Sequence, residues 1–189
     1  TSTAAILDMD VSRVKVTPLE IGGGSGGKIP IYLEPIVATL SKKSRRPVKA
    51  IMERSNVFQA SGPAPGGTIT VKMGTDKNGK IIAADTSIKL EAGGFPGAAV
   101  GAAVQCIFAP YDIANTRIDG YDIVVNKPKS AAYRAPGSPQ AAFATETVVN
   151  ELAELHGMDR VEFRQINASK EGTRRADGVV FPVIGNEEV

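Results

Sequence analysis

The sequence has very few of the residues that build disulfide or metal-bound frameworks: one cysteine, one histidine and no tryptophan among 189 residues. A single thiol cannot form an internal disulfide, a zinc site or a cysteine-ligated iron–sulfur cluster. Cys106 lies in an apolar run and is predicted to be a small buried side chain. His156 stands near a predicted helix end, where it suits the helix dipole better than catalysis.

Charge of one sign is not concentrated in this chain, and long apolar runs are missing. The formal net charge is +2, and the basic run at residues 42–46 is typical of a solvated helix end. No apolar stretch approaches the roughly 20 residues that span a bilayer, and no signal peptide opens the sequence. We therefore expect a cytoplasmic globular protein that binds neither nucleic acid nor membrane. Neither end closes a recognisable element, so we expect a fragment of a longer polypeptide, truncated at both ends.

Alternating apolar and polar residues predict a mixture of helices and strands, an α+β fold. The clearest signal is an antiparallel hairpin, in which Asn78 and Gly79 form a type I′ turn between residues 68–73 and 80–90. Residues 53–66 are expected to be irregular, and Gly120 is expected to kink or turn the chain. Other helices are predicted at 3–9, 31–40, 98–108, 138–157 with Ser138 as N-cap, and after Asp159; other strands are predicted at 14–17, 48–52 and 111–126.

The most informative stretch is the loop at residues 22–28, GGGSGGK, which contains five glycines in seven residues. Only glycine populates positive φ freely, and a backbone without side chains lets a ligand reach several N–H groups at once. Such a loop is costly in chain entropy, so it indicates a ligand bound by the backbone.

One candidate for this loop is a nucleotide-binding P-loop. The segment from Gly22 to Lys28 satisfies the first part of the G-x-x-x-x-G-K-[ST] pattern. Ile29 follows where the magnesium-binding hydroxyl should stand, and the only acidic partner pattern, at residues 81–85, falls in the predicted hairpin. A nucleotide-binding domain that uses Gly22–Lys28 remains an alternative, and a structural domain whose loop only packs against a partner chain is another.

A second segment, AYRAPG at residues 132–137, precedes the strong helix start at Ser138. Arg134 offers a planar fork of five donors to an anionic or carbonyl ligand. Together with the glycine loop, this segment belongs to a series of motifs that resembles the molybdopterin-binding large subunit of the xanthine dehydrogenase and aldehyde oxidase family, the molybdenum hydroxylases. The motifs are VKV at 14–16, GGGSGGK at 22–28, RPVK at 46–49, MER at 52–54, AYRAPG at 132–137, SPQ at 138–140, NELA at 150–153 and DRVEFRQIN at 159–167.

The resemblance implies where the cofactor and the substrate would bind. The glycine loop would bring backbone amides to the molybdenum centre, with the amide of Gly26 facing it, and residues 132–137 would form the other wall. No residue of this chain would bind the metal directly, and the glutamate that acts as general base would lie outside it. The implied cofactor-binding residues are Gly24, Ser25, Gly26, Gly27, Ala132, Tyr133 and Arg134, and the implied substrate pocket contains Ser25, Arg134 and Pro136.

Several positions depart from the family pattern. Ser25 replaces the usual aromatic residue of the loop, which leaves room for a larger or more polar substrate. Pro136 stands where xanthine-oxidising relatives have a phenylalanine that sandwiches the substrate, and Ile29 replaces a frequent acidic residue. Ala135 occupies the position of the copper-ligating cysteine of carbon monoxide dehydrogenases, and alanine cannot bind copper. These departures argue against xanthine and carbon monoxide as substrates.

The activity implied by the resemblance is oxidative hydroxylation of a small molecule, an aldehyde or an N-heteroaromatic compound, with oxygen from water. The implied cofactor is molybdenum–molybdopterin, in its cytosine dinucleotide form. The 2Fe–2S clusters and FAD would be on other subunits or domains, since one cysteine cannot hold a cluster. The partners would be the remaining part of the molybdopterin subunit and the iron–sulfur and FAD subunits. Residues 1–189 would be the first part of the cofactor-binding domain and inactive in isolation.

Overall fold

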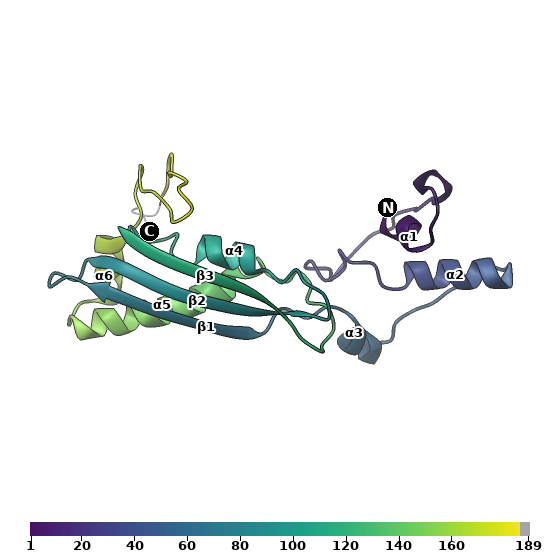
Figure 1. Ribbon diagram of the computed structural model, residues 1–189, viewed down its shortest axis with the longest axis horizontal. Helices are drawn as coiled ribbons and strands as arrows, with labels where there is room; N and C mark the ends of the chain where they lie inside the picture. The colour runs from purple at the N-terminus through teal and green to yellow at the C-terminus, as the bar shows by residue number, and fades with distance from the viewer. Residues whose placement is uncertain (186–189) are drawn as a thin grey trace. The chain divides into compact units, whose positions relative to one another are not determined.

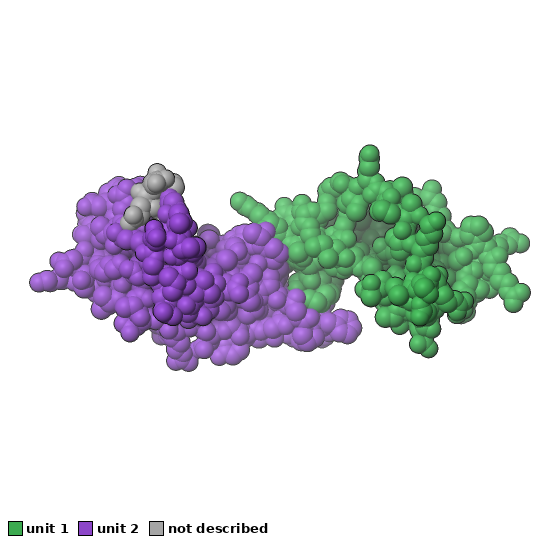
Figure 2. Space-filling model, turned by 90° about the horizontal axis from the view of Figure 1, so that it is seen from above, with its two compact units in different colours: residues 1–64, 128–134 green, residues 65–127, 135–189 purple. Residues whose placement is uncertain are grey.

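A computed structural model describes residues 1–185 as a series of short helices and three strands (Figure 1). The chain divides into two compact units (Figure 2). Unit 1 comprises Thr1–Ala64 and Pro128–Arg134, and unit 2 comprises Pro65–Lys127 and Ala135–Val189. The mixture of helices and strands confirms the predicted α+β class.

Unit 1 contains α1 (Ser2–Ile6), the 3-10 turn η1 (Val11–Arg13), α2 (Glu34–Ser44) and α3 (Arg54–Ala60). The predicted helix at 31–40 is α2, displaced by a few residues. It starts later because the Glu34 carboxylate accepts a hydrogen bond from the Tyr32 N–H at 2.9 Å, which holds residues 32–33 in the turn before the helix. It ends at Arg45, which adopts φ 55°, with two exposed lysines in the last turn, so the predicted solvated helix end is confirmed.

Three local predictions in unit 1 are wrong. Residues 14–17 and 48–52 are not strands in the described structure: Val14 has extended dihedrals, φ −111° and ψ 111°, but neither segment pairs with another. Alternation favours an extended backbone, whereas a strand also requires a hydrogen-bonded neighbour. Helix α3 occupies part of the segment predicted to be irregular, and Asn56 Oδ1 accepts from the Glu53 N–H at its start, at 3.1 Å.

Unit 2 is built on a three-stranded sheet of β1 (Gly67–Thr75), β2 (Ile81–Gly93) and β3 (Asn115–Val124), in that spatial order. Strands β1 and β2 are antiparallel, which confirms the predicted hairpin, and β2 and β3 are parallel. The even-numbered residues from Ala84 to Ala92 of β2, such as Ile88 and Leu90, are buried, while Asp85 and Lys89 on the opposite face are exposed. The sheet therefore has one apolar and one polar face.

The turn of the hairpin differs from the predicted type. Gly79 has φ 82°, but Asn78 does not have the positive φ that a type I′ turn requires. Instead the loop is longer, and the Asp76 carboxylate accepts hydrogen bonds from the N–H groups of Asn78, at 2.8 Å, and Lys80, at 2.9 Å. The Asp76 carboxylate thus stabilises this turn by hydrogen bonds, in place of the two consecutive residues at positive φ of a type I′ turn.

Helix α4 (Val100–Cys106) connects the parallel strands β2 and β3 and packs on the sheet. Gly120 lies inside β3 and neither kinks nor turns the chain: a Cβ there would lie 2.7 Å from both Val100 Cγ1 and Val104 Cγ2, so glycine allows the helix to approach the strand. Cys106 is exposed, so its predicted burial is wrong. The helical period buries Ala103 and Ile107 and turns Cys106 away from the core.

Helices α5 (Ser138–Leu155) and α6 (Arg160–Asn167) complete unit 2. Ser138 is the first helical residue of α5 rather than its cap, because Gly137 takes the capping position at φ 89°. Asp159 caps α6 as predicted, with its carboxylate accepting from two backbone N–H groups, which lowers the pKa of that carboxyl. His156 ends α5, and its Nε2 lies 2.7 Å from Thr75 Oγ1.

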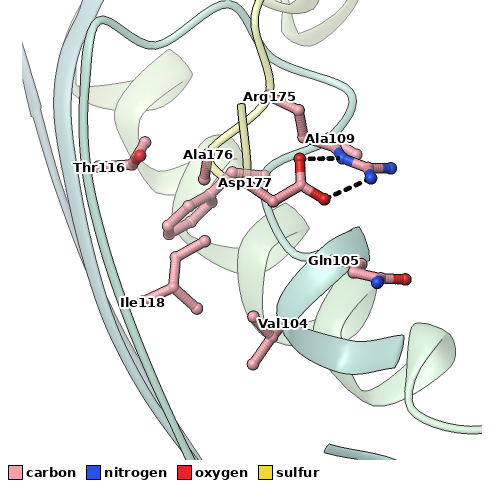
Figure 3. Close-up of a pocket in the computed structure, with 9 residues that line it drawn as sticks. Val104, Gln105, Ala109, Thr116, Ile118, Arg175, Ala176 and Asp177 are labelled. Carbon is pink, nitrogen blue, oxygen red and sulfur yellow. Dashed lines mark hydrogen bonds and ion pairs between the residues drawn. The ribbon is translucent and has the colours of Figure 1, made fainter. Parts of the chain in front are cut away.

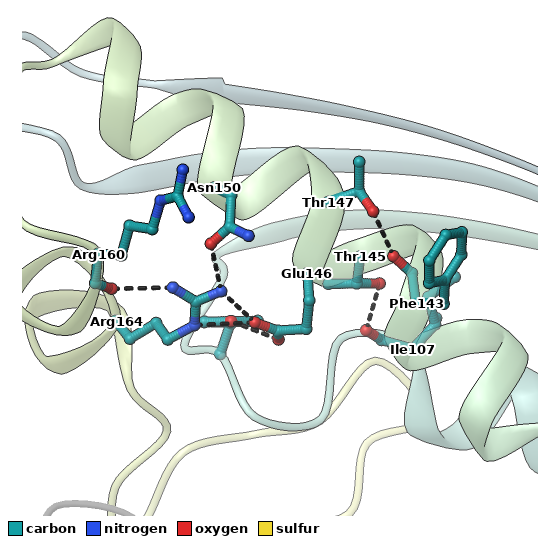
Figure 4. Close-up of polar contacts among 9 residues, drawn as sticks. Ile107, Phe143, Thr145, Glu146, Thr147, Asn150, Arg160 and Arg164 are labelled. Carbon is teal, nitrogen blue, oxygen red and sulfur yellow. Dashed lines mark hydrogen bonds and ion pairs between the residues drawn. The ribbon is translucent and has the colours of Figure 1, made fainter.

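The DRVEFRQIN motif holds α6 in place (Figure 4). Arg164 donates to Glu146 Oε2 from Nε at 2.8 Å and from Nη2 at 2.6 Å, and to Asn150 Oδ1 at 2.8 Å, which links α6 to α5. Asn167 is fully buried and hydrogen-bonds Ile81 N, Gly79 O and Phe163 O. The motif therefore has a structural role. No helix among residues 1–185 is long and apolar enough to span a bilayer.

Candidate functional site

The glycine loop of unit 1 folds back on itself. The Gly27 N–H donates to Gly24 O at 2.8 Å, and the Lys28 ammonium donates to the carbonyl of Gly22. Ser25 and Gly26 have φ values of 46° and 90°, so even the single non-glycine residue of the turn is left-handed. Hydrogen bonds within the loop and its left-handed residues thus contribute to its conformation.

This geometry does not support a nucleotide site. In a P-loop the lysine reaches the bound phosphates and a helix begins directly behind the loop. Here the Lys28 ammonium binds the loop carbonyl of Gly22, and the next helix, α2, begins only at Glu34. Asp85, which ends the acidic partner pattern, lies in the hairpin of unit 2.

The loop packs backbone to backbone against the second predicted segment. A Cβ at Gly26 would lie 2.4 Å from Ala132 O, so only glycine permits this approach. The neighbouring segment is equally close: a Cβ at Gly62 would lie 2.5 Å from Ala131 Cβ, and the Ala131 N–H donates to Pro63 O at 2.9 Å. Residues that are about 100 positions apart therefore form one surface of unit 1.

A cavity of about 570 Å³ opens beside this surface within unit 1. Of the predicted site residues, Gly24, Ser25, Gly27 and Tyr133 line it, and Gly26 and Ala132 are in contact with each other next to it. Arg134 does not line the cavity. Its guanidinium is exposed, and within residues 1–185 it makes no hydrogen bond or ion pair. Pro136 belongs to unit 2.

Most residues of the cavity wall were not among the predicted site residues. Tyr32, Glu34, Met52, Arg54 and Phe58 also line it. The Arg54 guanidinium lies 5.8 Å from the centroid of the Phe58 ring, a cation–π arrangement. For the residues on α3, the available sequence signal was Asn56, since a polar side chain three residues after the cap Glu53 favours a helix start.

Unit 2 has a separate cavity of about 190 Å³ (Figure 3). Its wall is largely apolar, with Val104 and Phe108 from the region of α4 and Ile118 from β3. The only charged lining residues, Arg175 and Asp177, bind each other, with Arg175 Nε 2.8 Å from Asp177 Oδ1, and this pairing lowers the pKa of Asp177. The cavity therefore presents no unpaired charge to a ligand.

Known proteins match most of the chain. Residues 1–168 match the family model described as the molybdopterin cofactor-binding domain. The nicotinate dehydrogenase large molybdopterin subunit of Eubacterium barkeri is 31% identical over 182 residues, which cover 94% of this chain and 43% of that protein. The aldehyde oxidoreductase molybdenum-binding subunit PaoC of Escherichia coli K12 is 33% identical over 168 residues, which cover 88% and 23%.

A solved structure of aldehyde oxidoreductase from Desulfovibrio gigas superimposes with a TM-score of 0.81 at 28% identity, over 89% of this chain and 19% of that one. The chain thus spans less than half the length of each of these relatives. The resemblance predicted from the ordered motifs is confirmed, and the chain belongs to the molybdopterin cofactor-binding domain family.

Proposed function

We propose that this chain is part of the catalytic subunit of a molybdenum hydroxylase and that unit 1 provides one wall of the cofactor site. The observation that carries this proposal is the set of free backbone donors on the glycine loop. The N–H groups of Gly24, Ser25 and Gly26 donate to no group within residues 1–185, although the loop is otherwise internally hydrogen-bonded. Fixed amide dipoles of this kind stabilise negative charge on a ligand.

The residues of unit 1 fit a metal that arrives in an organic cofactor. Within residues 1–185 no three His, Cys, Asp or Glu side chains gather in metal-binding geometry. Backbone amides and an unpaired guanidinium, that of Arg134, are donors suited to the oxygen atoms and phosphates of a pterin cofactor. We therefore assign Gly24, Ser25, Gly26, Gly27, Ala132, Tyr133 and Arg134 to cofactor binding and no residue to the metal itself.

The bound cofactor would supply the two-electron oxidation that introduces oxygen from water into an aldehyde or an N-heteroaromatic substrate. The chain would position it: the loop amides would hold it, and the close packing of Gly26 on Ala132 would keep those amides in place. Ser25 and Arg134 of unit 1 would shape the substrate pocket, with Ser25 leaving room that an aromatic side chain would fill. The general-base glutamate would come from outside this chain.

The remaining assignments follow from the same family membership. The cofactor would be the cytosine dinucleotide form of molybdopterin, and electrons would leave through 2Fe–2S clusters and FAD on other subunits or domains. The partners would be the rest of the molybdopterin subunit and the iron–sulfur and FAD subunits. Units 1 and 2 would belong to one cofactor-binding domain, which is supported by the span of the family match across residues of both. Residues 1–189 alone would be inactive.

The test compares two glycine variants in the full-length protein. Gly26→Ala places a Cβ against Ala132 at a positive φ, whereas Gly22→Ala meets no atom within 4 Å and has no such φ. We expect Gly26→Ala to lose bound molybdenum, measured by elemental analysis, and to lower turnover of aldehydes or N-heteroaromatics about a hundredfold. Gly22→Ala should match the wild type.

Two results would contradict the proposed function. The first is wild-type protein that contains no molybdenum and hydroxylates no member of an aldehyde and N-heteroaromatic panel. The second is micromolar binding of Mg·ATP that Lys28→Ala abolishes, which would favour the nucleotide-binding alternative.

A further inference from the structure

Tyr32 lies between the glycine loop and α2, and its side chain borders the cavity of unit 1. Its hydroxyl donates to Gly27 O at 2.9 Å and accepts from the Gly62 N–H at 3.0 Å. A phenolic hydroxyl has one donor and can accept in return, so both of its functions are used by backbone groups. Among residues 1–64, no other side chain joins the loop to the segment at residues 61–63 by hydrogen bonds.

These two backbone groups belong to two segments that both pack on residues 131–132. Gly27 directly follows Gly26, whose N–H donates to no group within residues 1–185 and whose Cα packs on Ala132. Gly62 is packed just as closely on Ala131, the residue before Ala132. The Tyr32 hydroxyl therefore links the glycine loop, which packs on Ala132, to the segment at residues 61–63, which packs on Ala131.

Unit 1 has no apolar core that could hold the loop in place. Its buried apolar residues are Ala4 and Pro35, so the loop depends on its close backbone contacts and on hydrogen bonds. The tyrosine itself is well anchored, because its own N–H donates to Glu34 Oε2 at the start of α2. The side chain has only two rotatable bonds and a rigid ring, so it can hold two backbone segments at a fixed separation.

We propose that Tyr32 is a positioning residue that fixes the distance between the glycine loop and the wall at residues 131–132. Its effect on the cofactor rests on the proposed function, whereas its effect on the loop does not. Removal of the hydroxyl leaves Gly27 O and the Gly62 N–H without a partner and frees the loop to shift. A displacement of the loop amides changes how they meet a ligand, because hydrogen bonds weaken steeply with poor geometry.

The experiment compares Tyr32→Phe with Tyr121→Phe in the full-length protein. Tyr121 is a matched control because it lies on β3 in unit 2, is exposed, and its hydroxyl makes no hydrogen bond within residues 1–185. Amide hydrogen exchange is measured by mass spectrometry on peptides that span residues 22–28, where the Gly27 N–H is the hydrogen-bonded one, and its exchange should accelerate about fivefold in Tyr32→Phe. Molybdenum content, the Mo(V) electron paramagnetic resonance spectrum, kcat and KM are measured on the same samples.

In Tyr32→Phe we expect an altered Mo(V) spectrum and a fall in kcat of about tenfold or more, with KM less affected, because the reacting centre is displaced while the substrate pocket remains. Tyr121→Phe should leave all readouts unchanged. If the loop amides of Tyr32→Phe exchange at the wild-type rate, the proposal is overturned. So does a lower melting temperature with unchanged exchange, spectrum and kcat, since that marks a structural role only. Wild-type protein without molybdenum overturns the proposed function instead, and the exchange rates then decide the role of Tyr32 in the loop.

Discussion

Unit 1 and unit 2 are stabilised in different ways. The buried apolar side chains belong to unit 2 with the exceptions of Ala4 and Pro35, and Phe163, Ile88 and Val149 are completely buried. In unit 1, large apolar residues such as Leu19 and Phe58 are 83% and 78% exposed. Unit 2 therefore has a core of its own, whereas the shape of unit 1 depends on turns, glycine contacts and single polar bridges.

The candidate site lies on unit 1, the unit without an apolar core of its own. Backbone groups can bind a ligand only where they are not already used by a helix or sheet, and the loop at residues 22–28 meets this condition. In unit 2 most backbone groups of the helices and of the central strand β2 are used by secondary structure, and Arg164 of the DRVEFRQIN motif links α6 to α5. Exposed apolar surface of the kind found on unit 1 is typical of regions that pack against other protein.

The largest expected effect is the loss of stability when a buried aromatic side chain of unit 2 is removed, compared with an exposed one of unit 1. Phe163→Ala should lower the free energy of unfolding by about 3–5 kcal/mol, because it leaves a cavity in a core that cannot collapse fully. Phe58→Ala in unit 1 should change it by less than about 0.5 kcal/mol, since that ring is exposed. Urea unfolding followed by circular dichroism measures both. Equal losses in the two variants would break the comparison between the units.

A smaller effect is expected at the polar group buried in unit 2. Asn167→Ala should lower the free energy of unfolding by about 2–3 kcal/mol, because Gly79 O, Phe163 O and the Ile81 N–H lose their partner. Asn115→Ala is the control: Asn115 is exposed and donates one hydrogen bond to Ile82 O, so the loss should stay below about 1 kcal/mol. The same denaturation measurement distinguishes them, and a loss at Asn115 as large as at Asn167 would contradict the structural role of the motif.

The smallest effect concerns Tyr111, whose hydroxyl donates to Glu146 Oε1 at 2.6 Å. Burial, and then the neighbouring Glu146 carboxylate, raise the pKa of this phenol well above its ordinary value of 10.0. Above pH 10 the unfolded chain loses this proton while the folded chain keeps it, so stability is intact below pH 10 and falls as the pH rises further.

Unfolding measured between pH 8 and pH 11 tests this dependence. We expect Tyr111→Phe to be about 1 kcal/mol less stable than the wild type at pH 8, and its stability should decline less steeply above pH 10. Tyr121→Phe should keep the wild-type pH dependence, because Tyr121 is exposed. Parallel curves for the wild type and Tyr111→Phe would show that the burial of Tyr111 is not coupled to its ionisation.

Predictions from the sequence succeeded where a residue's own conformational preference decides the structure. The hairpin at residues 68–90 and the cap at Asp159 follow from alternation and from a short carboxylate. They failed at residues 14–17 and 48–52, where a partner strand was needed, and at Cys106, where the register of a short helix decides exposure. The candidate site divides in the same way: Gly24–Gly27 could be named from the sequence, but Tyr32 and Phe58 could not.

The sequence by itself determined the family of this chain and the loop that marks its candidate site, because glycines, caps and ordered motifs act locally and survive without knowledge of the fold. Only the tertiary structure decided that Gly26 meets Ala132, that Gly120 admits α4 and that the Tyr32 hydroxyl joins two glycine segments. These contacts join residues that are distant in the chain, and their geometry depends on backbone positions that no local preference encodes.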